Sequence, residues 1–161
     1  MTRFIALIGF AFLAACSAQN DTLNTAQKTG QKTGQNAGAE LTTDNAAHAE
    51  DARLAAVLVY ADWCSSCKVI DPKIAAAKAA GPMENVSFVT LDYTDRNAHA
   101  FFQQADQLGI GAPIRAQLEG NVKTGILLLV DLDDQKVVGD LRKELSAQDI
   151  RSQIISAANA A

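Results

Sequence analysis

The chain has 161 residues, of which 48% are hydrophobic and 20% are charged, so its length suits one globular domain with little chain to spare. Its formal net charge of −4 argues against nucleic-acid binding, which needs a basic face, and against electrostatic attachment to anionic lipid. No apolar run reaches the roughly 20 residues of a membrane-spanning helix, and three cysteines with two histidines are too few for a convincing zinc cage.

The N-terminal residues have the order of a secretory signal: Arg3 comes first, an apolar stretch follows from Phe4 to Leu13, and small residues come next. The ending Leu13-Ala14-Ala15-Cys16 resembles the lipobox of bacterial lipoproteins. That resemblance implies cleavage after residue 15 and a lipid on Cys16, and it implies a protein in the bacterial cell envelope that faces the periplasm. Ser17 stands where an aspartate tends to retain such proteins at the inner membrane, so the outer membrane is slightly favoured. The alternative is an ordinary signal peptide with an incidental cysteine.

The segment 16–45 is expected to be a lipidated cysteine followed by a flexible polar linker, because it is rich in Thr, Gln, Asn and Gly and has almost nothing to bury. A four-residue repeat, Gln27-Lys-Thr-Gly30 and then Gln31-Lys-Thr-Gly34, is too short to be a solenoid unit. A frayed polar helix is the alternative. The sequence therefore divides into a signal peptide at 1–15, this linker, and a folded domain at 46–161.

Within the domain, the apolar pattern predicts elements in the order β-α-β-α-β-β-α after a weakly indicated helix at 46–54. Apolar runs with β-branched residues predict buried strands at 55–60, 86–91, 126–130 and 136–141. Helical spacing predicts helices at 65–80, from a cap at Asp95 to Leu108, and after Ser146, whose partner in a capping box is Asp149. The segment 109–123 is expected to be irregular and to form a lid or a partner surface. This order predicts an α/β fold with a central mixed sheet of about four strands and helices on both faces.

Two cysteines lie where the first strand meets the first long helix, in Trp63-Cys64-Ser65-Ser66-Cys67-Lys68. At a helix N-terminus, unpaired backbone N–H groups and the helix dipole favour a thiolate, so Cys64 is the expected nucleophile. Cys67, one turn further along, is the expected resolving thiol, and Lys68 adds a positive charge. A purely structural disulfide and half of a zinc site have the same spacing, but the chain has no second such pair and no paired histidines, so no metal is expected.

The stretch from Val57 to Pro72 resembles the thioredoxin superfamily in its strand, in Trp63 before the pair, in Lys68 after it, and in the helix-kinking Pro72. The resemblance covers about residues 54–158 and implies a thioredoxin-like fold. It also implies thiol–disulfide exchange, with the nucleophilic role carried to Cys64 and the resolving role to Cys67. Trp63 is then expected on the rim on which substrate peptides rest.

The sequence departs from the family where a cis-proline usually faces the cysteine pair. Gly125 stands at that place, so Thr124 and Gly125 are the expected rim residues, joined by a trans bond. Because glycine has no side chain, it predicts a roomier and less ordered docking edge. Pro113 is the other candidate for the missing proline.

A second departure concerns the proton acceptor of the resolving thiol. Leu58 and Thr90 stand where the family has a buried acid and a matching lysine, so the usual acceptor for Cys67 is missing. Asp62 or a water molecule is expected to take its place.

These features together predict a membrane-anchored thiol–disulfide oxidoreductase that needs no cofactor and is more a reductase than an oxidant of envelope proteins. Its expected partners are protein thiols and disulfides of the cell envelope and a membrane electron donor. The alternative is a protein of another class, a non-catalytic thioredoxin-fold binding module that keeps a structural disulfide. The missing proline favours that module, and the retained Trp-Cys-x-x-Cys-Lys motif favours the enzyme.

Overall fold

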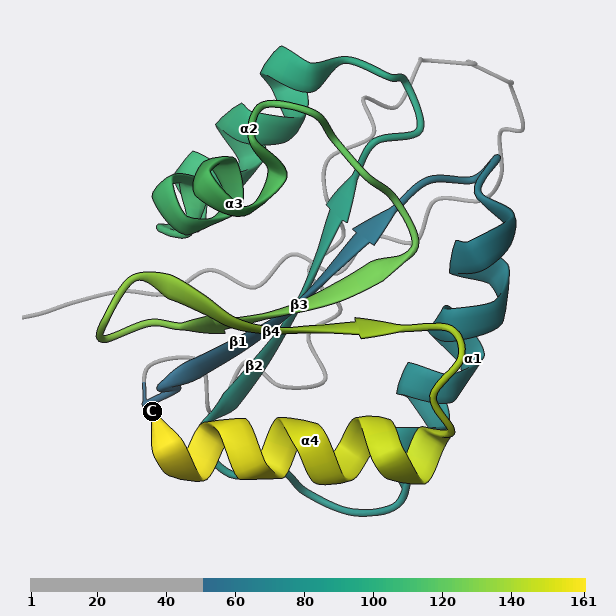
Figure 1. Ribbon diagram of the computed structural model, residues 1–161, viewed down its shortest axis with the longest axis vertical. Helices are drawn as coiled ribbons and strands as arrows, with labels where there is room; N and C mark the ends of the chain where they lie inside the picture. The colour runs from purple at the N-terminus through teal and green to yellow at the C-terminus, as the bar shows by residue number, and fades with distance from the viewer. Residues whose placement is uncertain (1–50) are drawn as a thin grey trace, which may run out of the picture. The chain divides into compact units, whose positions relative to one another are not determined.

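The computed structural model describes residues 51–161, which form a four-stranded mixed sheet flanked by four helices (Figure 1). The expected signal peptide at 1–15, the lipidated Cys16 and the linker at 16–45 lie outside these residues. The elements in chain order are β1 (Leu54–Tyr60), α1 (Ser65–Ala79), β2 (Val86–Asp92), α2 (Ala98–Gln107), α3 (Gly111–Leu118), β3 (Ile126–Asp131), β4 (Lys136–Arg142) and α4 (Ala147–Ala160).

The strands lie in the order β2-β1-β3-β4, which confirms the mixed sheet expected from the sequence. Strand β1 pairs with β2 in parallel and with β3 in antiparallel orientation, and β3 and β4 form the terminal hairpin. Because β1 is central, its carboxyl end is held between two neighbours. The segment that follows it, where the cysteine pair lies, is therefore anchored in a fixed place.

Each face of the sheet is covered by two helices, as expected for strands that are apolar on both sides. Alternate residues of β1 point to opposite faces. Leu54, Ala56 and Leu58 belong to the core beneath α1 and α4, and Ala55, Val57 and Val59 to the core beneath α2 and α3. The long apolar run of β1 is thus explained because the strand contributes residues to both cores.

The expected helix at 46–54 is wrong where it can be compared, because Leu54 already begins β1 and donates its N–H to the carbonyl of Asn85 at 3.0 Å. Residues 46–50 lie outside the described part. The expected cap at Asp95 is also wrong. Helix α2 begins two residues later, where Asn97 accepts a hydrogen bond from the N–H of Ala100 at 3.1 Å.

The segment 109–123 is not an irregular lid, because it contains α3. The core between the sheet and helices α2 and α3 includes three almost fully buried residues of this segment, Ile110, Ile114 and Leu118. Helix α3 is therefore part of the folded domain. Pro113 lies in the first turn of α3, where the missing N–H has no intrahelical partner to lose. Pro113 is therefore not the counterpart of the family's cis-proline.

The remaining helix signals agree with the structure. Helix α4 begins with the capping box of Ser146 and Asp149, in which the Ser146 hydroxyl accepts from the Asp149 N–H at 3.1 Å. Pro72 lies inside α1 on its exposed side. Between residues 51 and 161, no helix has both the length and the apolar character that crossing a bilayer requires.

Candidate active site

The cysteine pair occupies the start of α1, just beyond the carboxyl end of β1. Cys64 is the N-cap of α1, with extended backbone angles of φ −82° and ψ 110°, and its Sγ accepts a hydrogen bond from the N–H of Cys67 at 3.1 Å. Both side chains are free thiols. Cys64 is 6% exposed and Cys67 is 0% exposed, so Cys64 is the sulfur nearer to solvent. This is the arrangement that the strand-to-helix spacing predicts.

The two thiols have pKa values displaced in opposite directions. Burial by itself would raise the pKa of Cys64. Hydrogen bonds from the Cys67 thiol, the Thr124 hydroxyl and the backbone N–H groups of Cys67 and Ser66 outweigh it and hold that pKa below its ordinary value. Burial and the neighbouring Cys64 sulfur raise the pKa of Cys67 to about 11, against the opposing effect of two backbone N–H groups. Cys64 is therefore the better nucleophile, and Cys67 remains protonated beside it.

Thr124 contributes to this difference, and its contribution is testable. Thr124→Val removes the hydroxyl with little change in volume, so the pKa of Cys64 is expected to rise. Below that pKa a smaller fraction of the sulfur is then thiolate. The rate of Cys64 alkylation by iodoacetamide at pH 7 should fall by about twofold to fivefold, since a more basic thiolate is also intrinsically more reactive. Thr124→Ser keeps the hydroxyl and is the matched control. Equal alkylation rates for the wild type and the valine variant would show that the Thr124 hydroxyl does not lower the pKa of Cys64.

Gly125 lies directly against the cysteine pair, and the space there is filled. It has φ +81°, and a Cβ at this position would lie 2.5 Å from the Cβ of Ser66 and 3.2 Å from the Sγ of Cys64. Its own N–H donates to the carbonyl of Val59 at 2.8 Å. The expectation of a roomier docking edge is therefore wrong, because the glycine lets the backbone approach the sulfur closely. All described peptide bonds are trans, including the one between Thr124 and Gly125.

Trp63 forms an exposed rim beside Cys64, and the loop after β2 holds it in place. The indole is 46% exposed, and its Nε1 donates to the carbonyl of Thr94 at 2.9 Å. The ring meets Tyr93 edge to face, with centroids 6.4 Å apart, and the Arg96 guanidinium carbon lies 4.3 Å from the centre of the ring. Sequence reasoning missed these three loop residues. Because β1 and β2 are adjacent parallel strands, their carboxyl ends lie at the same edge of the sheet. The loop after β2 is therefore expected beside the cysteine pair, and this is the signal that could have found these residues.

The other expected supporting residues lie around the start of α1. Asp62 is exposed, its N–H donates to the Thr94 hydroxyl at 3.1 Å, and its carboxylate lies near Tyr60. Burial, and after it this carboxylate, raise the pKa of Tyr60. The Cys67 thiol donates to the carbonyl of Val59 at 3.7 Å. Lys68 is exposed on α1 and forms no ion pair with another described residue.

The positions of the family's buried acid and lysine are paired across two strands, since Leu58 lies opposite Thr90 in the parallel register of β1 and β2. Both line a hollow of about 190 Å³ beside α1, whose other lining residues include Asp71 and Lys78. Neither Leu58 nor Thr90 can accept a proton from a thiol at neutral pH. A charged acceptor in the usual place is therefore missing from this site.

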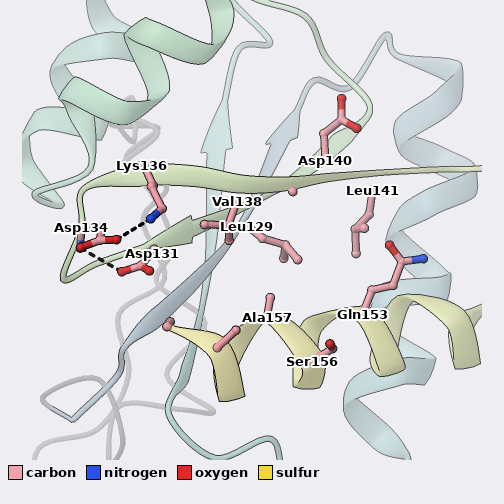
Figure 2. A pocket seen from close by; sticks show the side chains of 13 residues that line it. Leu129, Asp131, Asp134, Lys136, Val138, Asp140, Leu141, Gln153, Ser156 and Ala157 are labelled. Atoms are coloured by element: carbon pink, nitrogen blue, oxygen red, sulfur yellow. Dashed lines mark hydrogen bonds and ion pairs between the residues drawn. The ribbon is translucent and has the colours of Figure 1, made fainter.

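A separate groove of about 530 Å³ lies between the β3–β4 hairpin and α4 (Figure 2). Leu129 and Leu141 form part of its apolar wall, and its polar rim includes Asp131, Asp134 and Lys136. No residue of the cysteine pair lines it. In the part of the chain from 51 to 161, no group of three or more His, Cys, Asp or Glu side chains is arranged to hold a metal ion.

Comparison with known proteins agrees with this fold. The Thioredoxin family model matches residues 38–106, a segment that includes β1, the cysteine pair, α1 and β2. Over this segment the chain is similar to thioredoxins, and the strand order of its sheet is that of the thioredoxin-like fold expected from the sequence. Among solved structures, the chain is similar to Trxlp from Edwardsiella tarda EIB202, with 19% sequence identity, a TM-score of 0.44, and coverage of 71% of this chain and 93% of that one. No curated protein matches the chain.

Proposed function

We propose that this protein is a thiol–disulfide oxidoreductase that reduces disulfides of other proteins with the Cys64–Cys67 dithiol. The observation that carries the proposal is the asymmetry of the pair. One sulfur caps a helix and has a lowered pKa, and the other is fully buried and protonated directly behind it. A structural disulfide has no need of such a difference, because it needs no attacking thiolate.

The reaction proceeds in two exchanges. The Cys64 thiolate attacks one sulfur of the partner's disulfide, a bond forms between Cys64 and that sulfur, and the other sulfur leaves as a thiolate that takes a proton from water. The Cys67 thiol then loses its proton, and its thiolate attacks the Sγ of Cys64. The partner's second thiolate leaves and is protonated. Two electrons pass to the partner, which becomes a dithiol, and Cys64 and Cys67 end as a disulfide.

The second exchange requires Cys67 to become a thiolate without a buried acid to take its proton. The negative Cys64 sulfur is one of the causes that raise the pKa of Cys67. When Cys64 forms a bond to the partner, it loses that charge, and this cause disappears. The N–H groups of Ala61 and Gly125, which lower the pKa of Cys67, remain in place. Mixed-disulfide formation therefore makes Cys67 easier to deprotonate at the step where its thiolate is required.

The proposed direction is reduction, and the proposed partners are disulfides of cell-envelope proteins. The oxidised pair then needs a reductant, for which a dithiol electron donor in the membrane is the proposed source. No histidine or other cationic side chain stands between the two cysteines, where it would stabilise the thiolate strongly enough to make the pair a strong oxidant.

The test is to mix the reduced protein with a peptide that contains one internal disulfide and to follow both by mass spectrometry. We expect the peptide to gain two hydrogens while the protein loses two, one for one, through a Cys64–Cys67 disulfide. A non-catalytic binding module would leave the peptide oxidised and both protein thiols free, and that result would overturn the proposal.

The location is proposed from the sequence alone: a lipid on Cys16 anchors the protein to a membrane on the periplasmic side. Metabolic labelling with palmitate in a bacterial host is expected to mark the wild type and to leave Cys16→Ala unlabelled, because the acceptor thiol is gone. Cys64→Ala has an intact lipobox and is the matched control. Equal labelling of the wild type and Cys16→Ala would contradict the anchor and leave the redox chemistry untouched.

A further inference from the structure

We infer that Arg96 makes the rim of the cysteine pair selective for disulfides flanked by acidic residues; this rests on the proposed function and names its substrate class. Arg96 follows β2, far from Cys64 in the sequence. Its guanidinium nevertheless lies 4.3 Å above the ring of Trp63, the residue that directly precedes Cys64. The cation therefore lies on the residue next to Cys64, at the rim of the cysteine pair.

The loop backbone is shaped to place the arginine there. Arg96 has φ +55°, a left-handed conformation that is unfavourable for a side chain with a Cβ, and its N–H donates to the carbonyl of Tyr93 at 3.0 Å. The same turn gives the carbonyl of Thr94 to the indole N–H of Trp63. Contacts of the turn with Trp63 offset the cost of the conformation, and cation–π attraction is among them.

The charge of Arg96 is not neutralised within the described residues. Four other cationic side chains, those of Arg53, Arg115, Lys136 and Arg142, form ion pairs with nearby aspartates. Among residues 51–161, the guanidinium of Arg96 has neither an ion pair nor a hydrogen bond. Its N–H groups remain available for a carboxylate of a partner.

None of the acids closest to the rim forms an ion pair with Arg96. The Asp92 carboxylate accepts from the N–H of Thr94 at 2.8 Å and from its hydroxyl at 2.6 Å. The Asp62 carboxylate lies near Tyr60 and outside ion-pair distance of Arg96. Asp95 is exposed beside Arg96 in the chain but lies outside ion-pair distance of it. Lys68, which directly follows Cys67 in the chain, is exposed and also forms no ion pair with a described residue. The rim therefore favours acidic over basic peptides, although the whole chain is acidic.

The test compares the reduction rates of three peptides that share one disulfide and differ only in two flanking residues, which are both Glu, both Gln or both Lys. For the wild type, the second-order rate constant should be highest for the Glu peptide, exceeding that of the Gln peptide by about threefold to fivefold at low salt, with the Lys peptide slowest. Arg96→Gln should bring the Glu-to-Gln ratio close to one. Arg96→Lys should give an intermediate ratio, because it keeps the charge and loses the planar stacking.

Arg53→Gln is the matched control, because it removes the same charge from the opposite end of β1 and should keep the wild-type ratio. At about 0.5 M salt the ratio should decline in the wild type, since exposed charges are screened. A wild-type ratio of one, or a ratio that survives in Arg96→Gln, would overturn the inference while the reduction itself still supports the proposed function.

A binding measurement keeps the inference testable without any redox step. Trp63 is the sole tryptophan of the chain, so its fluorescence reports on the rim directly. A cysteine-free peptide rich in Glu should change this fluorescence saturably, and Arg96→Gln should weaken the apparent affinity by about threefold to tenfold. Equal affinities for the two proteins would overturn the role of Arg96. A protein that binds this peptide through Arg96 but reduces none of the disulfides would instead refute the proposed function.

Discussion

Replacing Cys64 with serine is expected to abolish disulfide reduction, with a loss of at least about a thousandfold in rate, because the hydroxyl of serine is not ionised at neutral pH. Cys67 cannot take over the attack. It is 0% exposed, and its pKa of about 11 leaves it protonated at neutral pH. The measurement is the steady-state reduction of a peptide disulfide with a small-molecule dithiol as the electron source.

Cys67→Ser distinguishes the two roles. In this variant Cys64 still attacks, but the step that releases the partner is missing, so a stable mixed disulfide should accumulate on Cys64. Cys64→Ser should form few such adducts, and the double variant, which has neither thiol, is the control. If Cys64→Ser trapped partners and Cys67→Ser did not, Cys67 would be the exposed nucleophile, in contradiction of the helix-cap geometry.

Substituting Gly125 by alanine is expected to give the largest loss of stability near the site. The backbone there has φ +81°, which is unfavourable for alanine, and the new Cβ would meet the Cβ of Ser66 at 2.5 Å and the Sγ of Cys64 at 3.2 Å. The strain and the forced displacement together should lower the free energy of unfolding by about 2–4 kcal/mol, measured by urea titration. Gly125→Pro should be worse still, because it also removes the N–H that donates to Val59, and proline is restricted to φ near −65°.

Gly120→Ala is the control that distinguishes the steric clash at Gly125 from the cost of a positive φ. Gly120 has a similar φ of +73°, but a Cβ there would meet nothing within 4 Å. Its substitution should therefore cost only the conformational part, about 1 kcal/mol. In addition, Ser66→Gly should partly rescue Gly125→Ala, since it removes the closest clash. If the two alanine variants lost equal free energies of unfolding, the clash of the new Cβ at position 125 with Ser66 and Cys64 would contribute little.

The strands and long helices were predictable because their apolar periodicity is strong and their caps are local. Helix α3 was missed because its start contains residue types that usually interrupt helices, namely Gly109, Gly111 and Pro113. In addition, its N-cap residue, Ile110, provides no side-chain hydrogen bond. The spacing of Ile110, Ile114 and Leu118 is the helical signal that could have found it. Similarly, Asn97 rather than Asp95 caps α2, a two-residue ambiguity between good capping residues that only the backbone resolves.

At the candidate site, the placement of Cys64 and Cys67 at the start of α1 followed from the sequence, because strand, turn and helix are neighbours in the chain. The packing of Gly125 against Ser66 and the stacking of Arg96 on Trp63 did not. Both contacts join segments that are distant in the chain, and both depend on a positive φ that a sequence pattern does not specify. The absence of a side chain at Gly125 suggested open space, whereas the fold uses that absence to bring the backbone closer.

The role of the Cys64–Cys67 pair in thiol–disulfide exchange can be tested directly by measuring its redox equilibrium. The protein is incubated at graded ratios of reduced to oxidised dithiothreitol, and the free thiols are then alkylated. We expect a reversible two-electron transition between dithiol and disulfide. Its midpoint should lie closer to the roughly −270 mV of a reducing thioredoxin than to the roughly −120 mV of a strong oxidant. A pair that remains oxidised, or remains a dithiol, across all ratios would contradict a role in thiol–disulfide exchange.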